Sequence, residues 1–416
     1  MSLRSFHNGL RRRFPPIILL LSLLSAFPPL ATDMYLPALP QLQEEWGVSF
    51  AQVNLSLVVF FLSYCCFLLI HGPLSDRFGR KPPLFAGISI FVAASLLCAL
   101  ATSVEMMIVG RFLQGAGASA SSAVVFATSK DRFSGTERQK VFVQIGAIVA
   151  AAPMLAPVLG GWLLKILSWH WIFVFQALLG CIALVGVYFM RETLPEKSNA
   201  GLDSVFLGYA RLLINQGYVR QLLLFSLIGM PLFAFIGGSA DLYMNTMGYS
   251  AQQYGYFFAF NSAAFILAPL TFARVSRHYS VRLLIPLAFC GMFSGGLALL
   301  LPVLPVPWRL ALPMLWTTFC FSFCRPAGNN LILEEVSTDV GSASSLMVFF
   351  YFVFGAAGIW VFSHNWQDKQ QVLAIMTMLV AALALVLWFL HAWLPAPGAE
   401  KSRGTKKSRA GRTPEP

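Results

Sequence analysis

Twelve long apolar segments constrain the fold of this chain more than any other feature of its sequence. Each has about 20 residues, the length at which an α-helix crosses the hydrocarbon core of a bilayer. They lie near residues 14–36, 50–71, 83–103, 106–128, 141–164, 169–190, 220–243, 252–273, 283–303, 309–331, 343–363 and 371–393. Because backbone groups in lipid need hydrogen-bond partners within their own segment, we expect an all-α integral membrane protein with 12 transmembrane helices.

The composition excludes a soluble globular domain. Only 11% of the 416 residues are charged and 57% are hydrophobic, whereas soluble domains carry roughly 25% charged residues. The first apolar segment follows Arg11, Arg12 and Arg13 as in a signal peptide, but its length and the similar segments after it indicate an anchor that is retained. The seven cysteines lie inside apolar segments without metal-ligand spacing, so we expect no disulfide, no metal and no cofactor.

The distribution of cations predicts the orientation, since Lys and Arg accumulate in cytoplasmic segments. If the N-terminus is cytoplasmic, the outer loops hold only Lys165, Arg309 and Lys369 of the 29 cations, and Arg111 and Arg325 lie within spans. This pattern predicts a multi-pass membrane protein with both termini in the cytoplasm. The net charge of +12 follows from this topology, so the lipid bilayer is an expected partner and nucleic acid is not.

The polar segment after the sixth span divides the chain into two halves. We expect a cytoplasmic N-terminus, an N-terminal six-helix half, a cytoplasmic central loop, a C-terminal six-helix half and a basic cytoplasmic tail, at residues 1–13, 14–190, 191–219, 220–393 and 394–416. The second half repeats the first weakly, because ARVSRHYSVR takes the place of GPLSDRFGRK without its acid and glycines. Two pseudo-symmetric halves are typical of a transporter with its site between them, for which a monomer suffices.

The segment GPLSDRFGRKP, at residues 72–82, is the most specific loop in the sequence. Its glycines suit a tight turn or a close backbone approach, and Pro82 suits the start of a helix. Asp131 lies at the end of span 4, and we expect it at the same membrane depth as the charged residues of this loop. Together these charges would form a cluster that acts as a gate. The residues of this predicted gating loop are Gly72, Asp76, Arg77, Gly79, Arg80, Lys81 and Asp131. The alternative is an ordinary basic loop of the cytoplasmic side.

This loop resembles the signature between spans 2 and 3 of the major facilitator superfamily. LATDMYLPALP at 30–40, RFLQGAGAS at 111–119 and APVLGGWL at 156–163 follow in the matching order. Together they resemble the drug:proton antiporter group, and within it the Bcr/CflA branch of multidrug efflux transporters. The resemblance implies the major facilitator fold, with no enzymatic activity. It also implies export of small amphipathic compounds or drugs across the bacterial inner (plasma) membrane, in exchange for protons and by alternating access.

Ionisable residues within the spans are candidates for function, because each costs at least ~2.5 kcal/mol near the membrane centre. Asp33 and Arg111 are expected at similar depth, where a direct or water-bridged contact is feasible. Asp33 would titrate, and Arg111 would be the fixed cation that sets its pKa. The resemblance implies proton coupling and substrate recognition for these two residues. The alternatives are a structural ion pair or an Asp33 at the headgroups.

The predicted substrate cavity adds two residues to this pair. Gln114 lies one helical turn from Arg111 and faces the same side of span 4. Tyr64 of span 2 is the aromatic candidate, although aromatic residues at helical spacing usually face the core or lipid. The predicted cavity residues are Asp33, Arg111, Gln114 and Tyr64.

Two further charged residues lie near the ends of spans in the second half. Asp241 is the second candidate for proton coupling, but its place at the outer end of span 7 favours a surface residue. Arg325 lies in the inner part of span 10. For Arg325 a helix-end ion pair with Glu334 or Glu335 is as plausible as a site.

Span 5 carries glycines and prolines that bend and thin a helix. The resemblance implies that this segment is the antiport motif, with residues Gly146, Pro153, Pro157, Gly160 and Gly161. Ala152 and Ala156 stand where glycines are usual, which weakens the indication of transport direction.

Three classes of function are compared with the sequence: a membrane enzyme, an exporter of amphipathic compounds and a transporter of a specific metabolite. A membrane enzyme is disfavoured because no HExxH, GxSxG or Walker pattern is present, and without a nucleotide site an ion gradient must supply the energy. Because the spans contain few polar residues, we expect a largely apolar cavity, which favours amphipathic small molecules. The favoured function is therefore export of such compounds in exchange for protons. The alternative is a proton-coupled importer or exporter of a specific metabolite such as a nucleoside.

Overall fold

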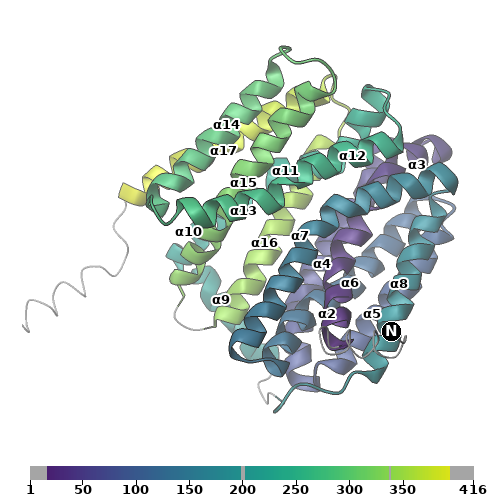
Figure 1. Cartoon of the computed structure of the whole chain (residues 1–416), viewed down its shortest axis with the longest axis vertical. Coiled ribbons are helices and arrows are strands. Elements are labelled where there is room, and N and C mark those ends of the chain that lie inside the picture. Colours follow the sequence, from purple (N-terminus) through teal and green to yellow (C-terminus); the bar gives the residue numbers. More distant parts are fainter. Residues whose placement is uncertain (1–15, 198–201, 337–338, 394–416) are drawn as a thin grey trace, which may run out of the picture.

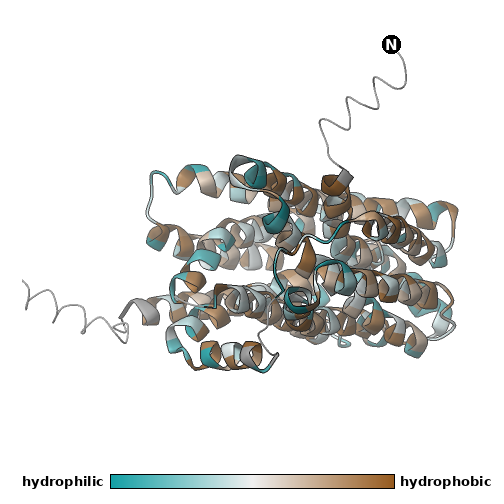
Figure 2. Ribbon diagram, turned by 90° about the horizontal axis from the view of Figure 1, so that it is seen from below, coloured by the Kyte–Doolittle hydropathy of each residue, from teal (hydrophilic) through white to brown (hydrophobic). Residues whose placement is uncertain are grey.

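The computed structural model describes residues 16–197, 202–336 and 339–393, and within these ranges the chain is helical without strands. The expected cytoplasmic N-terminus at 1–13 and the basic tail at 394–416 lie outside the described residues. The predicted all-α class is confirmed. Figure 2 shows hydrophobic residues along most of the helices and hydrophilic residues mainly in the segments that join them.

The first six spans form one half of the molecule, on the right in Figure 1. Helices α4 and α5 both pack along α6, while α2 packs on α7 and α5 on α8. The elements are α2 (Pro16–Asp33), η1 (Leu36–Ala38), α3 (Leu39–Trp46), α4 (Phe50–Phe78), α5 (Lys81–Ala99), α6 (Val104–Arg132), α7 (Gly135–Ile166) and α8 (His170–Phe189).

The last six spans form the other half, on the left in Figure 1. Helix α9 (Leu202–Ile214) connects the halves and packs on α10 and α16. The remaining elements are α10 (Gln216–Leu227), α11 (Met230–Ala240), the π-helix η2 (Asp241–Thr246), α12 (Ala251–Ser262), α13 (Ala264–Val275), α14 (Val281–Leu300), α15 (Trp308–Glu334), α16 (Val340–Phe362) and α17 (Lys369–Trp393).

The structure contains a helical segment for each of the twelve expected spans. In the described part of the chain, ten segments are long and apolar enough to cross a membrane, with α10, α11 and η2 forming one and α12 and α13 another. The other two, α6 and α15, have 29 and 27 residues. They are less apolar because they carry polar groups such as Arg111 and Gln114 in α6 and Arg325 and Asn329 in α15. The predicted twelve-helix, two-half architecture is confirmed.

The helices end at two opposite faces of the molecule. We call the end with α9 and the α4–α5 turn the α9 face, and the end with α3 and the start of α12 the α3 face (Figure 1). The halves meet where α7 packs along α12 and α4 along α16. At the first contact a Cβ on Gly255 would lie 2.7 Å from the backbone oxygen of Pro157. Glycine therefore permits α7 and α12 to approach this closely.

Candidate functional site

Asp33 is the last residue of α2 and is only 6% exposed. Its Oδ1 accepts a hydrogen bond from Thr32 Oγ1 at 2.8 Å. The same hydroxyl lies 3.1 Å from the backbone oxygen of Pro28. Asp33 is thus a buried carboxylate in the molecule's interior, at the turn that leads into η1.

Arg111 of α6 is completely buried. Its Nη1 donates to the backbone oxygen of Ala31 at 2.9 Å, and its guanidinium carbon lies 4.2 Å from the Phe60 ring centroid and 5.0 Å from that of Tyr35. Among the described residues, no ion pair joins it to Asp33 within 4.0 Å, and Nε and Nη2 have no hydrogen-bond partner. Asp33 and Arg111 are therefore close in the fold without a direct contact.

Two amide side chains, those of Gln114 and Gln176, connect Arg111 with other helices of the first half. Gln114 accepts from Arg111 Nη1 and donates through Nε2 to Ser95 Oγ at 2.8 Å and to Gln176 Oε1 at 2.7 Å. Gln176 of α8 donates in turn to the backbone oxygen of Leu30 at 3.2 Å. Gln176 was not among the predicted site residues, although an amide in the apolar span 169–190 indicates a polar contact within the membrane. The network joins α2, α5, α6 and α8 around Arg111.

Tyr64 of α4 is buried between the halves. Its ring stacks with Phe60 at a centroid distance of 6.3 Å and meets Phe352 of α16 edge-on at 5.1 Å. Through Phe60, which covers Arg111, Tyr64 connects the buried cation with the second half.

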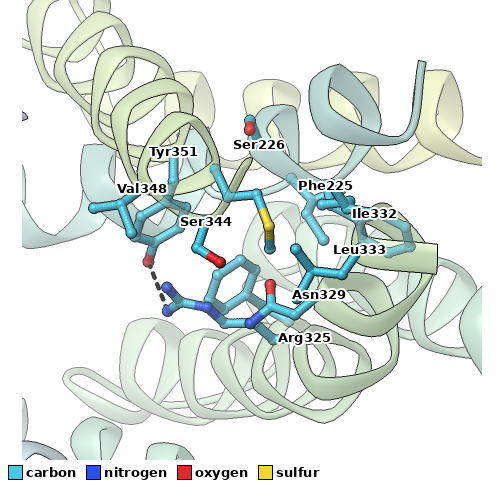
Figure 3. A pocket seen from close by; sticks show the side chains of 12 residues that line it. Phe225, Ser226, Arg325, Asn329, Ile332, Leu333, Ser344, Val348 and Tyr351 are labelled. Carbon is cyan, nitrogen blue, oxygen red and sulfur yellow. Dashed lines mark hydrogen bonds between the residues drawn. The ribbon is translucent and has the colours of Figure 1, made fainter. Parts of the chain in front are cut away.

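A cavity of about 220 Å³ lies between α10, α15 and α16 (Figure 3). Arg325 Nη1 lies 3.3 Å from Tyr351 Oη, and the guanidinium carbon is 4.2 Å from the Tyr351 ring centroid. The ion pair expected with Glu334 or Glu335 is not formed in the described part of the chain, because Arg325 turns toward α16 instead. The lining does not include the four predicted cavity residues, Asp33, Arg111, Gln114 and Tyr64.

Asp241 is buried, 6% exposed, so the expectation of a surface residue is wrong. Lys369, at the start of α17, lies 2.6 Å from Asp241 Oδ2, and Asn245 Nδ2 donates to Oδ1 at 2.8 Å. The Lys369 ammonium also lies 4.3 Å from the ring centroid of Phe50 in the first half. The carboxylate is thus paired with a cation of α17, a contact that sequence position alone did not indicate.

The α4–α5 turn assembles part of the predicted gating loop. Arg80 pairs with Asp76 and, at 2.8 Å, with Asp131 of α6, and it donates to Ser75 Oγ at 2.8 Å. Burial lowers the pKa of Arg80, but the hydrogen bonds that it donates to Asp131 and Asp76 outweigh this effect and raise the pKa above its ordinary value. Arg77 lies outside this network, over the Phe78 ring.

Lys81 also lies outside the network, and it opens helix α5. Its Nζ donates to the backbone oxygen of Tyr188 at 2.6 Å. Pro82 occupies the first turn of α5, as expected. The prediction that Gly72 serves a tight turn or a close backbone approach is wrong. Helix α4 continues to Phe78 and places this glycine inside the helix, where an added Cβ would meet nothing within 4 Å.

Glu192, after α8, caps the start of α5 and was missed by the sequence analysis. Its carboxylate accepts the backbone N–H groups of Arg80 at 2.9 Å and Lys81 at 3.1 Å. Gly79 has φ of 104°, and its missing side chain leaves the room that this carboxylate fills. Burial alone would raise the pKa of Glu192. The hydrogen bonds that its carboxylate accepts from the backbone N–H groups of Leu194, Arg80, Lys81 and Thr193 have the larger effect, so the pKa is below its ordinary value. Glu192 lies 112 positions from Arg80 in the chain, so local sequence contained no signal for this contact.

The predicted antiport motif lies in α7 at the boundary between the halves. Pro157 has no N–H to donate to the Pro153 oxygen, which accepts from Ser262 Oγ of α12 at 3.3 Å instead. Gly160 packs against the backbone of Met34 and Gly161 against that of Ala251, while Gly146 has open space around it. The motif thus contacts both the segment before η1 and the second half.

Comparison with known proteins gives a consistent family. A family model described as Major Facilitator Superfamily matches residues 21–359. An uncharacterized MFS-type transporter, YdgK of Bacillus subtilis (strain 168), is 30% identical over 82% of this chain and 87% of its own length. The bicyclomycin resistance protein homolog of Haemophilus influenzae is 28% identical over 90% of this chain and 95% of its own length.

Solved structures show the same fold at low sequence identity. A mutant of the nucleoside transporter NupG has a TM-score of 0.70 at 16% identity, covering 90% of this chain and 98% of that chain. A bacterial homolog of the human lysosomal transporter Spinster, in an inward-facing and occupied conformation, has a TM-score of 0.74 at 13% identity, covering 90% and 96%. At these identities the likeness concerns the fold alone.

Proposed function

Since the chain belongs to the major facilitator superfamily and is a multi-pass membrane transporter of small molecules, we propose that it is a proton-coupled antiporter. It exports small amphipathic compounds or drugs across the bacterial inner membrane, acts as a monomer, and has both termini in the cytoplasm. The relative from Haemophilus influenzae, which is named as a bicyclomycin resistance protein homolog, supports this class of substrate.

The observation that carries the proposal is the buried Asp33 beside a cation that it does not contact. An intramembrane carboxylate is costly and is retained where it serves transport. Arg111 binds the backbone oxygen of Ala31, two residues before Asp33, rather than the carboxylate. Asp33 is therefore free of an ion-pair partner among the described residues. A small movement of α2 against α6 would change the field at Asp33 and so release or bind a proton.

Contacts between the halves suggest the step of the cycle. Near the α3 face, Asn54 Nδ2 donates to Ser363 Oγ at 2.7 Å, and Asn245 of η2 reaches Gln43 of α3 at 3.4 Å. Arg325 and Asn329, toward the α9 face, are exposed. With the α3 face toward the periplasm, this arrangement is an inward-facing state. Outward opening would admit a proton to Asp33 and favour substrate release, and proton release to the cytoplasm would follow.

The proposed gate of the α9 face is the Asp76–Arg80–Asp131 cluster. It lies at the ends of α4 and α6, which must move against the second half if the α9 face closes and opens. The proton carrier and the gate would thus occupy different depths of the same half.

The direct test is transport by the purified chain in proteoliposomes. A strain without its own efflux pumps first identifies a compound from a panel of antibiotics, dyes and nucleosides, beginning with chloramphenicol. An imposed pH gradient should then drive uphill accumulation of that compound, and a protonophore should abolish it. Accumulation that ignores the pH gradient would contradict proton coupling, and selective nucleoside transport would contradict drug export.

The proposed orientation has its own test. Reporters fused at Glu105, between α5 and α6, should report a periplasmic position, and reporters at Arg138, at the start of α7, a cytoplasmic one. The opposite pattern would contradict the orientation and leave the fold unaffected.

A further inference from the structure

The cavity between α10, α15 and α16 combines a cation with hydrogen-bonding groups and an apolar wall. Arg325 and Asn329 lie one helical turn apart on α15, and Ser344 faces them from α16 (Figure 3). The other lining residues are mainly apolar and include the aromatic rings of Phe225, Phe321 and Tyr351. No carboxylate is among these residues, so the cavity is positively charged.

Arg325, like Arg111, forms no ion pair in the described part of the chain, but Arg111 is completely buried whereas Arg325 lines a cavity. Arg80 has two carboxylate partners and Lys369 has one, whereas no ion pair of Arg325 lies within 4.0 Å in the described ranges. Its side chain is exposed to the cavity, and the one hydrogen bond that it makes among the described residues, to Tyr351 Oη at 3.3 Å, is long. A charge within a span that serves only stability is normally paired. The missing negative charge therefore points to a ligand.

The geometry of Arg325 suits an anion that carries an apolar part. The Tyr351 ring lies 4.2 Å from the guanidinium carbon and restricts its movement. A guanidinium held in this way presents its remaining N–H donors to a carboxylate or a similar group, with two parallel hydrogen bonds. The rings of Phe225 and Phe321 lie on the same lining and would cover an aromatic or aliphatic body.

We propose that this cavity binds the anionic group of a small amphipathic organic acid, with Arg325 as its ionic partner. The inference rests on the proposed function and narrows its substrates to acids with a compact apolar part. The volume of about 220 Å³ is below the 300–1,000 Å³ that is typical of drug-sized sites. It accommodates a carboxylate on a fused pair of rings. The headgroup of an anionic lipid offers the same chemistry, and the test below separates the two sources.

The test measures binding of two matched probes, 2-naphthoate and 2-naphthamide, to the full chain in phosphatidylcholine nanodiscs. The probes have nearly the same shape, and only naphthoate is charged at pH 7. The wild type should bind naphthoate about tenfold more tightly than naphthamide. Arg325→Gln should abolish this preference without weakening naphthamide, and Arg325→Lys should retain part of it. Arg274→Gln removes an exposed cation of α13 and serves as the matched control, with no change expected.

A second set of nanodiscs contains phosphatidylglycerol. If an anionic headgroup also enters the cavity, this lipid should weaken naphthoate binding in the wild type and have no effect in Arg325→Gln. If the ligand is a free organic acid only, the lipid should have no effect in either. Equal affinity of the wild type for the two probes, absence of naphthoate binding, or full naphthoate affinity in Arg325→Gln would each overturn the proposal. Binding of the probes needs no pH gradient. The binding test can therefore be interpreted even if the proposed proton-driven transport is not observed.

Discussion

At the scale of single residues, Glu192 joins segments that are 112 positions apart in the chain. The first N–H groups of α5 have no partner within their own helix, and the Glu192 carboxylate supplies one. Its negative charge also lies at the positive end of the helix dipole. Gly79 makes the approach possible because a side chain there would occupy the place of the carboxylate. Glu192 thereby fastens the segment after α8 to the α4–α5 turn.

Glu192→Gln should lower the stability of the protein in detergent by about 0.5–1 kcal/mol near pH 7, a small effect because the residue is exposed. The pKa of Glu192 is lowered in the fold from 4.5, so its contribution is present above that pH and is lost as the pH falls below it. Thermal unfolding of both forms should converge at low pH. Glu196→Gln, an exposed acid four positions on, is the control, and an equal effect there would contradict the capping role.

Lys369 neutralises a carboxylate that is buried at the α3 face. Lys369→Met should destabilise the protein by about 3 kcal/mol, because Asp241 then remains buried without a counter-charge. The double variant Lys369→Met/Asp241→Asn should recover much of this loss. Thermal unfolding in detergent measures both. If the double variant is no more stable than Lys369→Met, the ion pair does not account for the effect.

At the scale of elements, the two carboxylates of the α4–α5 turn are not equivalent. The Asp131 side chain is 12% exposed and that of Asp76 is 54% exposed. An exposed pair contributes little, about 0–1 kcal/mol, and a buried charged hydrogen bond more, about 2 kcal/mol. The contact between α6 and Arg80 should therefore hold the turn more firmly than the contact within α4.

Asp131→Asn should consequently impair transport more than Asp76→Asn, while both variants bind substrate as the wild type does. Initial rates in proteoliposomes and equilibrium binding in detergent provide the two readouts. Asp203→Asn in α9, an exposed acid of the same face, controls for the loss of one charge. Equal transport by all three variants would mean that the cluster has no gating role.

The elements themselves were predictable because lipid imposes a minimum length and an apolar composition on each span. All twelve expected spans are helices, and α6 and α15 have the required length although polar residues such as Arg111 and Arg325 make them less apolar. The α4–α5 turn was placed correctly to within a few residues, but Gly72 was not, since α4 continues beyond the apolar run that marks its span. A helix end is set by capping groups such as Glu192, which hydropathy does not reveal.

The partners of the candidate site residues were less predictable than their identity. Asp33, Arg111 and Gln114 are buried as a local group, which the cost of polar groups in spans led us to expect. The contacts of Gln176 and Lys369 were not predicted because they join helices distant in sequence. The prediction of an ion pair for Arg325 was wrong for the same reason, since the side chain turns toward Tyr351 of another helix. Local spacing does not determine which helices become neighbours.

At the scale of the whole molecule, the contacts between the halves give a prediction for the alternating cycle. Asn54 and Ser363, which are hydrogen-bonded across the halves near the α3 face, should separate when that face opens. In a background without native cysteines, Asn54→Cys/Ser363→Cys joined by a short cysteine-reactive cross-linker should lose transport and still bind substrate. Each single cysteine variant treated with the reagent is the control. Normal transport by the cross-linked protein would show that this contact persists through the cycle.

The central claim is that Asp33 carries the proton exchanged for substrate, and substrate-induced proton release tests it most directly. Purified protein in weakly buffered detergent solution, with the transported compound from the efflux screen, should release protons in the wild type and in Asp203→Asn. Asp33→Asn should bind the compound, release no protons and show no pH-gradient-driven transport in proteoliposomes. Proton release and uphill transport by Asp33→Asn at wild-type levels would contradict the account.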